Sequence, residues 1–532
     1  MKTRRFATCL MMTALTTTAV SAQEGDPSPP PLDVLLTGGT VHDGTGADGV
    51  KADVGIAGDR IVLVGDAAGR TAKRTIDAAG KIVCPGFIDL HNHSDDEMTA
   101  DGTRGNLCYL TQGCTTIVTG NCGGGHVDVG VYFRRMEKDG IGTNVAHLLP
   151  HGAVRREAMG GSYDRPATAG ELAKIREIAE RGMKDGAVGM STGLIYTPGM
   201  YAATDEIVEM AKVVAAHGGF YATHMRTESE RLPDAVREAL EIGRRAGCRV
   251  HISHLKASTP PAWGKVKEAC ALIEAARAKG EPVAADQYPY TASSTGLAAS
   301  TMPGWAREGS EQSMIRRIDD KKDGPKIRAE VEKALRERGG ADKVQIASFA
   351  KHSAWNGMTL AAIAKETGKP APDVVLDILR RGGASVVNFS MCDEDVEYVM
   401  KKDYVATASD GSSKRPDGSV PHPRSYGTFP RKIGRYAIER GVIPLPHAIR
   451  SATSLPAEVL GLTDRGTLKA GQFADVAVLD PAEFRDVATF VKPHQYSTGV
   501  TWLFVNGVAT IADGKPTDAL PGRVIRNERR GR

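Results

Sequence analysis

The sequence is poor in aromatic side chains and in cysteine, and it has no long apolar run that could span a membrane. Phe, Trp and Tyr make up 5% of the 532 residues, and the eight cysteines are scattered along the chain. So few and so dispersed cysteines exclude a disulfide framework. An excess of one charge is also missing, because the formal net charge is only +4. A nearly neutral chain gives no electrostatic reason to expect a nucleic acid or a membrane surface as partner.

The first residues predict an export signal rather than part of the fold. Three cations among the first five residues precede a short apolar run at 6–18, and small residues follow up to Ala22. This order is typical of a secretory signal peptide, here residues 1–22, and a Pro-rich tether follows at 23–32. We therefore expect an exported protein, periplasmic or secreted, whose formal charge falls from +4 to +1 when the three cations leave with the signal.

The remaining chain predicts an α/β protein with two β-rich ends. Short strand-like runs separated by Gly and Asp turns fill residues 33–84 and 445–525, which predicts one small β-sandwich built from both ends. Between them, residues 85–444 alternate apolar strands with helical stretches, as in a TIM-like (β/α)8 barrel. Charged helices and short strands over about 295–400 predict an insertion between barrel strands seven and eight. The eight strands are expected at 82–91, 115–122, 145–151, 186–192, 220–225, 249–255, 283–290 and 405–410.

Histidines recur where successive barrel strands are expected to end. His91 and His93 follow the first strand, and alternate positions on a strand share a face. His224 ends the fifth strand, and His251 and His254 end the sixth. The last two are three residues apart, so only one of them faces the barrel mouth if the strand continues. Because catalytic groups of such barrels lie at the carboxyl ends of the strands, the pattern predicts a metal site there.

Cys122 and Asp410 stand at the expected ends of the second and eighth strands. Cys122 lies in the tight turn NCGGG, and Asp410 precedes a glycine. Each has a plain structural alternative, a buried thiol for the first and a turn-forming aspartate for the second. A thiolate is, however, a good zinc ligand, and one Cys with two His is a known catalytic zinc set.

These features resemble the amidohydrolase superfamily of metal-dependent hydrolases and, within it, the D-aminoacylase (N-acyl-D-amino-acid deacylase) family. The resemblance covers nearly all of the chain after the signal. It rests on PGFIDLHNHSD, GNCG, STGLIYTPG, THMRTES, HISHLK, DQYPYTASST, SDG followed by HPRSYGTFPR, and SATSLPAEVLGLTDRGTLKAGQFADVAVLDP. It implies a zinc-dependent hydrolase that cleaves the amide bond of N-acyl-D-amino acids, giving a carboxylate and a free D-amino acid.

The resemblance also implies how the metal is held. Many amidohydrolases bridge two metals with a lysine on strand four, and residues 186–192 contain none. The family pattern instead places Cys122 in that role. The implied ligands are Cys122, His224 and His254 for one tight Zn2+ site, with His91 and His93 at a second, weaker site.

The same resemblance assigns the chemistry and the substrate contacts. A metal-bound hydroxide would attack the acyl carbonyl, while Asp410 acts first as general base and then as general acid. Arginine binds carboxylates with two parallel hydrogen bonds, which suits an N-acyl amino acid. The residues expected around this small-molecule substrate are Arg424, Lys256, Tyr196, Tyr288 and Tyr290.

Two other functions fit the same motifs. One is a cyclic amide hydrolase or D-dipeptidase of the same superfamily, although the missing lysine on strand four argues against a hydantoinase-like enzyme. The other is a catalytically inactive relative that only binds, although the complete ligand set argues against it. The segment 298–305 on the expected rim carries no charged residue, which favours substrates with a neutral or apolar side chain.

Overall fold

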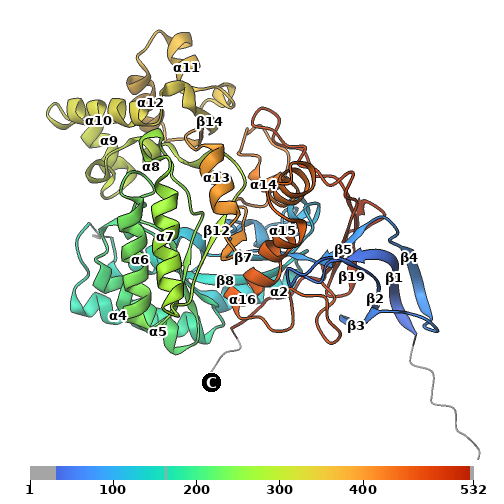
Figure 1. Cartoon of the computed structure of the whole chain (residues 1–532). Helices are drawn as coiled ribbons and strands as arrows, with labels where there is room; N and C mark the ends of the chain where they lie inside the picture. Colours follow the sequence, from blue (N-terminus) through green and yellow to red (C-terminus); the bar gives the residue numbers. More distant parts are fainter. Residues whose placement is uncertain (1–30, 162–163, 528–532) are drawn as a thin grey trace, which may run out of the picture.

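Eight parallel strands form a barrel at the centre of the molecule, as expected. The structure is a computed structural model that describes residues 31–161 and 164–527 (Figure 1). The predicted signal peptide and most of the tether therefore lie outside the described residues. The barrel strands are β6 (Phe87–Asp89), β7 (Cys114–Thr119), β8 (Asn144–Pro150), β9 (Gly189–Gly193), β10 (Phe220–His224), β11 (Arg249–Ile252), β12 (Val283–Gln287) and β16 (Val405–Thr407), paired in that order.

The barrel closes just beyond the ends of β6 and β16. The amide of Asp410 donates to the carbonyl of His91 at 2.8 Å, and the amide of His93 donates to the carbonyl of Gly411 at 2.7 Å. The closure therefore sets two of the expected site segments side by side, although they are more than three hundred residues apart in sequence.

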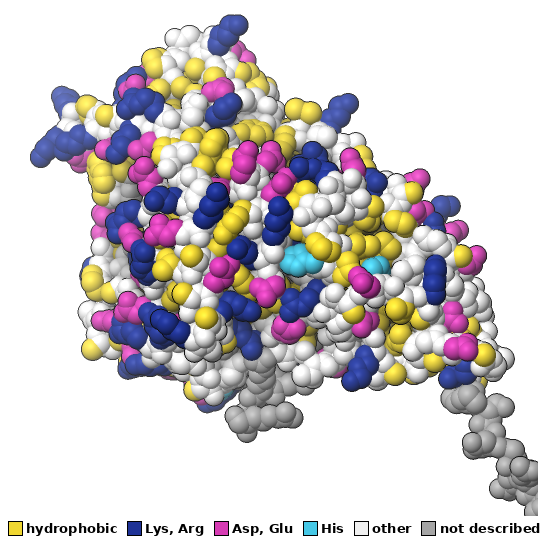
Figure 2. All heavy atoms as spheres, in the orientation of Figure 1, with side chains coloured by type: hydrophobic (Ala, Val, Ile, Leu, Met, Phe, Trp, Pro, Cys, Tyr) yellow, Lys and Arg dark blue, Asp and Glu magenta, His cyan; other side chains and the backbone are white. Residues whose placement is uncertain are grey.

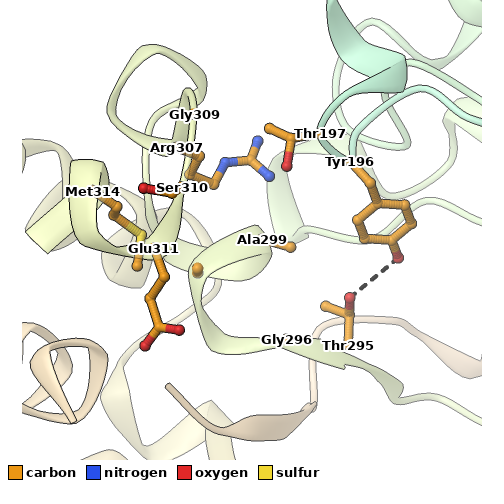
Figure 3. A pocket seen from close by; sticks show the side chains of 11 residues that line it. Tyr196, Thr197, Thr295, Gly296, Ala299, Arg307, Gly309, Ser310, Glu311 and Met314 are labelled. Atoms are coloured by element: carbon orange, nitrogen blue, oxygen red, sulfur yellow. Dashed lines mark hydrogen bonds between the residues drawn. The ribbon is translucent and has the colours of Figure 1, made fainter. Parts of the chain in front are cut away.

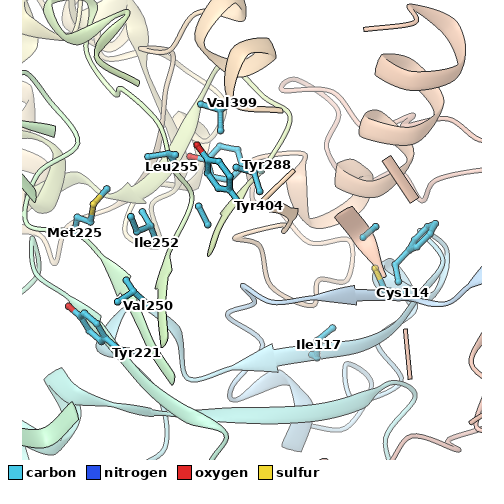
Figure 4. Packing of buried hydrophobic residues seen from close by; sticks show 14 of the residues in the cluster. Cys114, Ile117, Tyr221, Met225, Val250, Ile252, Leu255, Tyr288, Val399 and Tyr404 are labelled. Carbon is cyan, nitrogen blue, oxygen red and sulfur yellow. The ribbon is translucent and has the colours of Figure 1, made fainter. Parts of the chain in front are cut away.

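Helices surround the barrel and bury its strands on both sides. Every residue of β7 and β8 is buried, so these strands are covered on both faces rather than exposed on one. Figure 4 shows this packing, with Ile117 on β7 and Tyr221 on β10 among the buried side chains. The helices around the barrel are α1 (Leu107–Leu110), α2 (Val129–Asp139), α3 (His151–Met159), α4 (Ala169–Lys184), α5 (Thr204–Ala216), α6 (Leu232–Ala246), α7 (Lys265–Ala278), α13 (Asp393–Met400), α14 (Arg424–Pro430), the π-helical η8 (Arg431–Glu439), α15 (Leu445–Ala452) and α16 (Ser454–Leu460).

The expected first barrel strand is two strands, divided at Gly86. The first, β5 (Ile82–Pro85), pairs with the outer sheet, and only β6 belongs to the barrel. A Cβ on Gly86 would lie 2.2 Å from the side chain of Thr115 on the neighbouring strand. Only glycine fits where the chain passes from one sheet into the other at this distance.

Both ends of the chain build the second β-unit, as expected. Its strands pair in one continuous nine-stranded sheet, in which β5 lies between β1 and β17. An apolar cluster drawn from both ends, including Val54 and Trp502, fills its core. The strands are β1 (Leu32–Val41), β2 (Val50–Ala57), β3 (Arg60–Gly65), β4 (Ala72–Asp77), β5, β17 (Val476–Leu479), β18 (Val500–Val505), β19 (Val508–Ala512) and β20 (Lys515–Pro516).

A buried polar network ties this sheet to the barrel. Arg465 forms an ion pair with Asp475, which also accepts a hydrogen bond from the amide of Asn506 at 2.8 Å. Asn506 in turn donates to the side-chain oxygen of Asn144, at the start of β8, at 2.8 Å. Because all four side chains are buried, their partners replace the water that they lose on folding.

The expected insertion between β12 and β16 is a lobe with its own apolar core, seen at the top of Figure 1. Three antiparallel strands form its base, in the order β13-β15-β14. The lobe contains β13 (Ser293–Gly296), α8 (Leu297–Thr301), α9 (Glu311–Asp319), α10 (Asp323–Glu337), β14 (Val344–Ser348), α11 (Leu360–Thr367), α12 (Ala371–Arg380) and β15 (Ser385–Asn388). Since β13 follows directly on the carboxyl end of β12, the lobe rises from the rim of the barrel mouth.

Charged side chains of both signs lie on the face of the molecule that Figure 2 shows. Among the described residues, no helix combines the length and apolar character that crossing a bilayer requires. Figure 2 shows Lys and Arg side chains interspersed with Asp and Glu over one face of the molecule, with no field of a single sign on that face.

Candidate metal centre

Cys122 is the centre of a cluster of imidazoles at the barrel mouth. It lies in a 3-10 turn, η2 (Asn121–Gly123), directly after β7. Its Sγ is 3.2 Å from Nε2 of His91, 3.6 Å from Nδ1 of His224 and 3.7 Å from Nε2 of His254. Cys122 therefore contacts both His224 and His254, the two histidines that the resemblance assigns with it to a tight metal site.

The spacing and the protonation of this cluster fit a zinc ion. Two ligands on a tetrahedral zinc, one sulfur and one nitrogen, are about 3.5 Å apart. The distances of 3.6 and 3.7 Å from Cys122 to His224 and His254 are close to that separation. Burial alone would raise the pKa of Cys122, but the charge of His91 and the hydrogen bonds to the imidazoles bring it well below the ordinary value. These neighbours therefore favour the thiolate form of Cys122, the form that binds metal.

Asp410 joins the cluster from the opposite side. Its Oδ1 lies 3.1 Å from Nε2 of His93 and 3.4 Å from Nε2 of His91. Donor atoms of His91, Cys122, His254 and Asp410 all lie within 4.8 Å of one another, as do those of a second group, His224, Glu228 and His254. The two expected metal sites are therefore contiguous, because the Cys122 thiolate touches both His91 and His224.

Three residues of the cluster have a left-handed backbone. The φ angles are 52° for Cys122, 37° for His254 and 51° for Asp410. Residues with a Cβ rarely adopt this conformation, which costs of order 1–3 kcal/mol. Such conformations persist where the surroundings enforce them, and here they aim three side chains from three different strand ends at one point.

Two buried carboxylates contact the imidazole rings, and the sequence did not indicate this role for either of them. Oδ2 of Asp286, on β12, lies 3.5 Å from Nδ1 of His91 and 2.6 Å from Nε2 of His251. Oε1 of Glu228 lies 2.8 Å from Nδ1 of His254. Carboxylates behind metal-binding imidazoles fix the ring orientation and raise the basicity of the ligand. Asp286 could have been suspected as a charged residue inside an apolar strand, whereas Glu228 lies in a loop without such a signal.

Asp286 also connects His251 to His254, although only His254 belongs to the metal-binding groups. As expected, only one of the two joins the imidazole cluster, and β11 ends at Ile252, before that residue. The left-handed His254 then follows, and its amide donates to Oδ1 of Asp286 at 2.6 Å. One carboxylate therefore binds the ring of His251 and the backbone of His254.

A cavity of about 430 Å³ opens beside the cluster. Its wall includes His93, Cys122, Tyr196, Asp410 and Arg424. Nη1 of Arg424 donates to Oδ2 of Asp410 at 2.7 Å. Burial would raise the pKa of Asp410, but Arg424 and the neighbouring imidazoles hold it well below the usual value. The cavity therefore combines a thiolate, an ionised carboxylate and a guanidinium.

Lys256 lies behind the cluster rather than on the cavity wall. Its Nζ donates to Oε1 of Glu228 at 2.6 Å and lies 2.8 Å from Nδ1 of His254. In this arrangement Lys256 neutralises the carboxylate that supports His254. A direct contact with substrate, as the sequence suggested, would require this ion pair to open.

The three tyrosines differ in their distance from the cavity. Tyr196 lines it, and its ring packs on His224 with centroids 4.9 Å apart. Tyr288 is buried beneath Arg424, whose guanidinium lies 4.9 Å from the ring centre. Tyr290 is buried farther away, with its ring edge-on to that of His422. Tyr196 is thus placed to touch a ligand, Tyr288 to support Arg424, and Tyr290 to fill space.

Comparison with known proteins places this site in a family. A family model described as "Amidohydrolase family" matches residues 74–518. The curated D-aminoacylase of Alcaligenes xylosoxydans xylosoxydans is 34% identical, covering 93% of this chain and 98% of its own. The N-acyl-D-glutamate deacylase of the same organism is 35% identical, covering 93% and 97%.

Solved structures agree with these sequence matches. A D-aminoacylase structure described by its binuclear metal centre has a TM-score of 0.80 at 34% identity and covers 93% of this chain and all of its own. The N-acyl-D-glutamate deacylase from Bordetella bronchiseptica, complexed with zinc and a phosphonate that mimics the tetrahedral intermediate, has a TM-score of 0.80 at 32% identity with the same coverage. Together with the barrel and the cluster at its mouth, these matches show that the chain belongs to the amidohydrolase family.

Proposed function

We propose that this chain is a zinc-dependent deacylase that hydrolyses N-acyl-D-amino acids to a carboxylate and a free D-amino acid. The observation that carries the proposal is the shared cavity wall of Cys122, Asp410 and Arg424, which lie beside the imidazole cluster. A metal ligand, a proton carrier and a carboxylate-binding cation are the three groups that amide hydrolysis of such a substrate requires. The preference for D-amino acids is supported by the activities named for the relatives.

The protein would hold one zinc ion at Cys122, His224 and His254, and a second, weaker one beside His91 and His93. When bound, zinc acts as a Lewis acid that polarises the acyl carbonyl and lowers the pKa of water. The thiolate contributes one negative charge to the tight site, which compensates part of the charge of the ion.

Asp410 would move the proton. Its low pKa means that the carboxylate is ionised at neutral pH and can accept a proton from the attacking water. Its Oδ1 faces His91 and His93, while its Oδ2 is bound by Arg424. The same carboxylate then delivers the proton to the leaving amine nitrogen, so one group serves as base and as acid.

Arg424 would orient the substrate by its α-carboxylate. In the structure Nη1 is bound to Asp410, while Nη2 makes only a 3.3 Å hydrogen bond to the carbonyl of Ser294. A substrate carboxylate offers the guanidinium a stronger, charge-assisted partner than this carbonyl. The resulting contact would set the scissile amide beside Asp410.

We also propose that the protein works outside the cytoplasm. The proposal rests on the N-terminal signal pattern of residues 1–22, before the described part of the chain.

The test of the function is a hydrolysis screen. Paired N-acetyl-D- and N-acetyl-L-amino acids with apolar, basic and acidic side chains are incubated with the zinc-loaded enzyme, and release of the free amine is measured. We expect hydrolysis of D substrates and none of their L partners. Preference for L substrates, or activity only on cyclic amides, would refute the proposal.

Cys122→Ala tests the metal assignment. Loss of the thiolate should reduce zinc affinity by more than the roughly 10–100-fold that follows the loss of a supporting group. Zinc content after dialysis, measured by mass spectrometry of the metal, reports the loss directly. Cys392→Ala is the matched control, because that half-buried cysteine precedes α13 and belongs to neither metal-binding group. An unchanged zinc content in Cys122→Ala would show that the ligand set is wrong.

Asp410→Asn tests the proton carrier. The amide cannot accept the proton, so kcat should fall by about 10²–10⁴-fold, while zinc remains bound at Cys122 and the histidines. The exposed Asp403, two residues before β16, supplies the control Asp403→Asn, which should leave kcat unchanged. Full turnover by Asp410→Asn would rule out the role.

Export is tested by the mature N-terminus. Intact-mass measurement of the protein expressed with its natural leader in a Gram-negative host should show cleavage near Ala22 and recovery from the periplasm or medium. A cytoplasmic protein that retains Met1 would contradict the proposal.

A further inference from the structure

A buried carboxylate lies at the seam where β6 and β16 meet, beneath the strand ends that carry the reacting groups. Asp89 is the last residue of β6, and its side chain has no exposed surface. His91 and His93 follow it closely in the sequence, and on the other side of the seam Ser409 directly precedes Asp410. A contact between Asp89 and Ser409 therefore joins the segment of the two histidines to the segment of the proposed proton carrier.

Asp89 accepts hydrogen bonds from both sides of this seam. Its Oδ1 accepts from the amide of His91 at 3.3 Å and from the amide of Ser409 at 2.9 Å. Its Oδ2 accepts from Nδ2 of Asn92 at 2.9 Å and from Oγ of Ser409 at 2.6 Å. Because all four partners are donors, both oxygens serve as acceptors, and an ionised acceptor forms stronger hydrogen bonds than a neutral one. One side chain thus fixes the end of β6 against the end of β16.

Ser409 passes this constraint on to Asp410. The shortest contact of its hydroxyl is with the Asp89 carboxylate, which takes the single hydroxyl proton, so Tyr109, whose hydroxyl is 2.9 Å away, donates to Ser409. The amide of Gly411 donates to the same Oγ at 3.0 Å. Asp410 stands between Ser409 and Gly411 and has the left-handed φ of 51°. The residues before and after it are therefore tied to one another, which enforces this conformation.

The inserted lobe contacts the same region but holds Asp410 less tightly. Figure 3 shows the hydrogen bond of 3.1 Å between Tyr196 and Thr295 of β13, which joins the lobe to the barrel mouth. The lobe reaches Asp410 through Arg424, whose Nη2 donates to the carbonyl of Ser294 at 3.3 Å. Hydrogen bonds of a charged group are usually about 2.7–2.9 Å long, so this link is weaker than the contacts across the seam.

We propose that Asp89 is a positioning residue for hydrolysis, which holds Asp410 at its working distance from the imidazoles by tying the two strand ends together. This inference rests on the proposed function, in which Asp410 carries the proton. Asp89 itself belongs neither to the cavity wall nor to either metal-binding group. Its effect on the reaction is therefore exerted through Asp410, and a displacement of about 1 Å at a reacting group can cost about 10²-fold in rate.

Asp89→Asn tests the proposal. The amide nitrogen of the variant cannot accept a hydrogen bond, so one of the two oxygen positions loses its function. We expect kcat to fall by about 10–100-fold, with a smaller change in KM and with zinc retained. Asp475→Asn is the matched control, because Asp475 is a buried carboxylate that accepts hydrogen bonds from Asn144 and Asn506 away from the seam. It should lower the melting temperature and leave kcat of the zinc-loaded enzyme unchanged. A loss of zinc from Asp89→Asn that matches its loss of kcat would overturn the proposal.

Ser409→Ala keeps the proposal testable if Asp89→Asn does not fold. The variant removes one hydrogen bond to a charged group, so kcat should fall by about 10-fold. Thr407→Val is its control, because it removes another buried hydroxyl of β16, whose partner is Oγ of Ser451 at 3.0 Å. This control should keep the kcat of wild type. A wild-type kcat in Ser409→Ala would overturn the proposal, as would a wild-type kcat in Asp89→Asn.

A double-mutant cycle shows whether Asp89 acts through Asp410. In Asp410→Asn the proton carrier is already removed, so its position no longer affects the rate. We therefore expect Asp89→Asn to lower kcat in the wild-type background and to have little further effect when it is added to Asp410→Asn. The same fold loss in both backgrounds would overturn the proposal, because Asp89 would then support the enzyme independently of Asp410.

Crystal structures of wild type, Asp89→Asn and Thr295→Val separate this inference from the proposed function. The distance of 3.1 Å between Nε2 of His93 and Oδ1 of Asp410 should lengthen in Asp89→Asn. If it lengthens only in Thr295→Val, the lobe holds Asp410 and the proposal is wrong. If Asp410→Asn retains full turnover, the proton carrier is wrong, while a longer distance in Asp89→Asn still shows the positioning. If Asp410→Asn is inactive and Asp89→Asn matches wild type in distance and kcat, only the positioning fails.

Discussion

The hydrogen bonds that close the barrel between β6 and β16 bring the residues of the candidate site together. They fix the backbone of His91 and His93 against that of Asp410 and Gly411. Without this closure the proton carrier would not face the imidazoles, and Arg424, which follows on α14, would not reach Asp410. The strain of the left-handed residues is maintained by the same rigid frame, since a barrel buried on both faces cannot relax locally. The insertion adds the outer wall of the cavity, but the frame positions the reacting groups.

Much of this arrangement could be predicted from the sequence, because strand periodicity and strand ends are local signals. All eight barrel strands overlap their expected segments, and Cys122 contacts His224 and His254 as the motifs indicated. The division of the first expected strand at Gly86 could not be predicted, because residues 82–89 read as one apolar run. The division depends on the close approach of Gly86 to Thr115. Strand length also could not be read closely, because β11 ends at Ile252, three residues before the expected end of that strand.

The parts that sequence patterns missed are those defined by contacts between distant segments. Glu228 and Asp286 support the imidazoles from behind, and a lone acidic residue carries no spacing that announces such a role. Lys256 illustrates the same point, because a motif locates it near the site while only packing shows that it faces Glu228. Metal ligands can thus be inferred from sequence motifs more readily than the residues that support them.

The outer sheet makes the two ends of the chain depend on each other during synthesis. Strand β5 lies between β1, from the start of the chain, and β17, from its last sixty residues. The ion pair of Arg465 and Asp475 and the hydrogen bonds of Asn506 then join that late segment to β8. Until the ribosome has released the final strands, β5 has an open edge and Asn144 lacks its partner. A nascent chain of this design therefore stays incompletely folded until its last strands have been made.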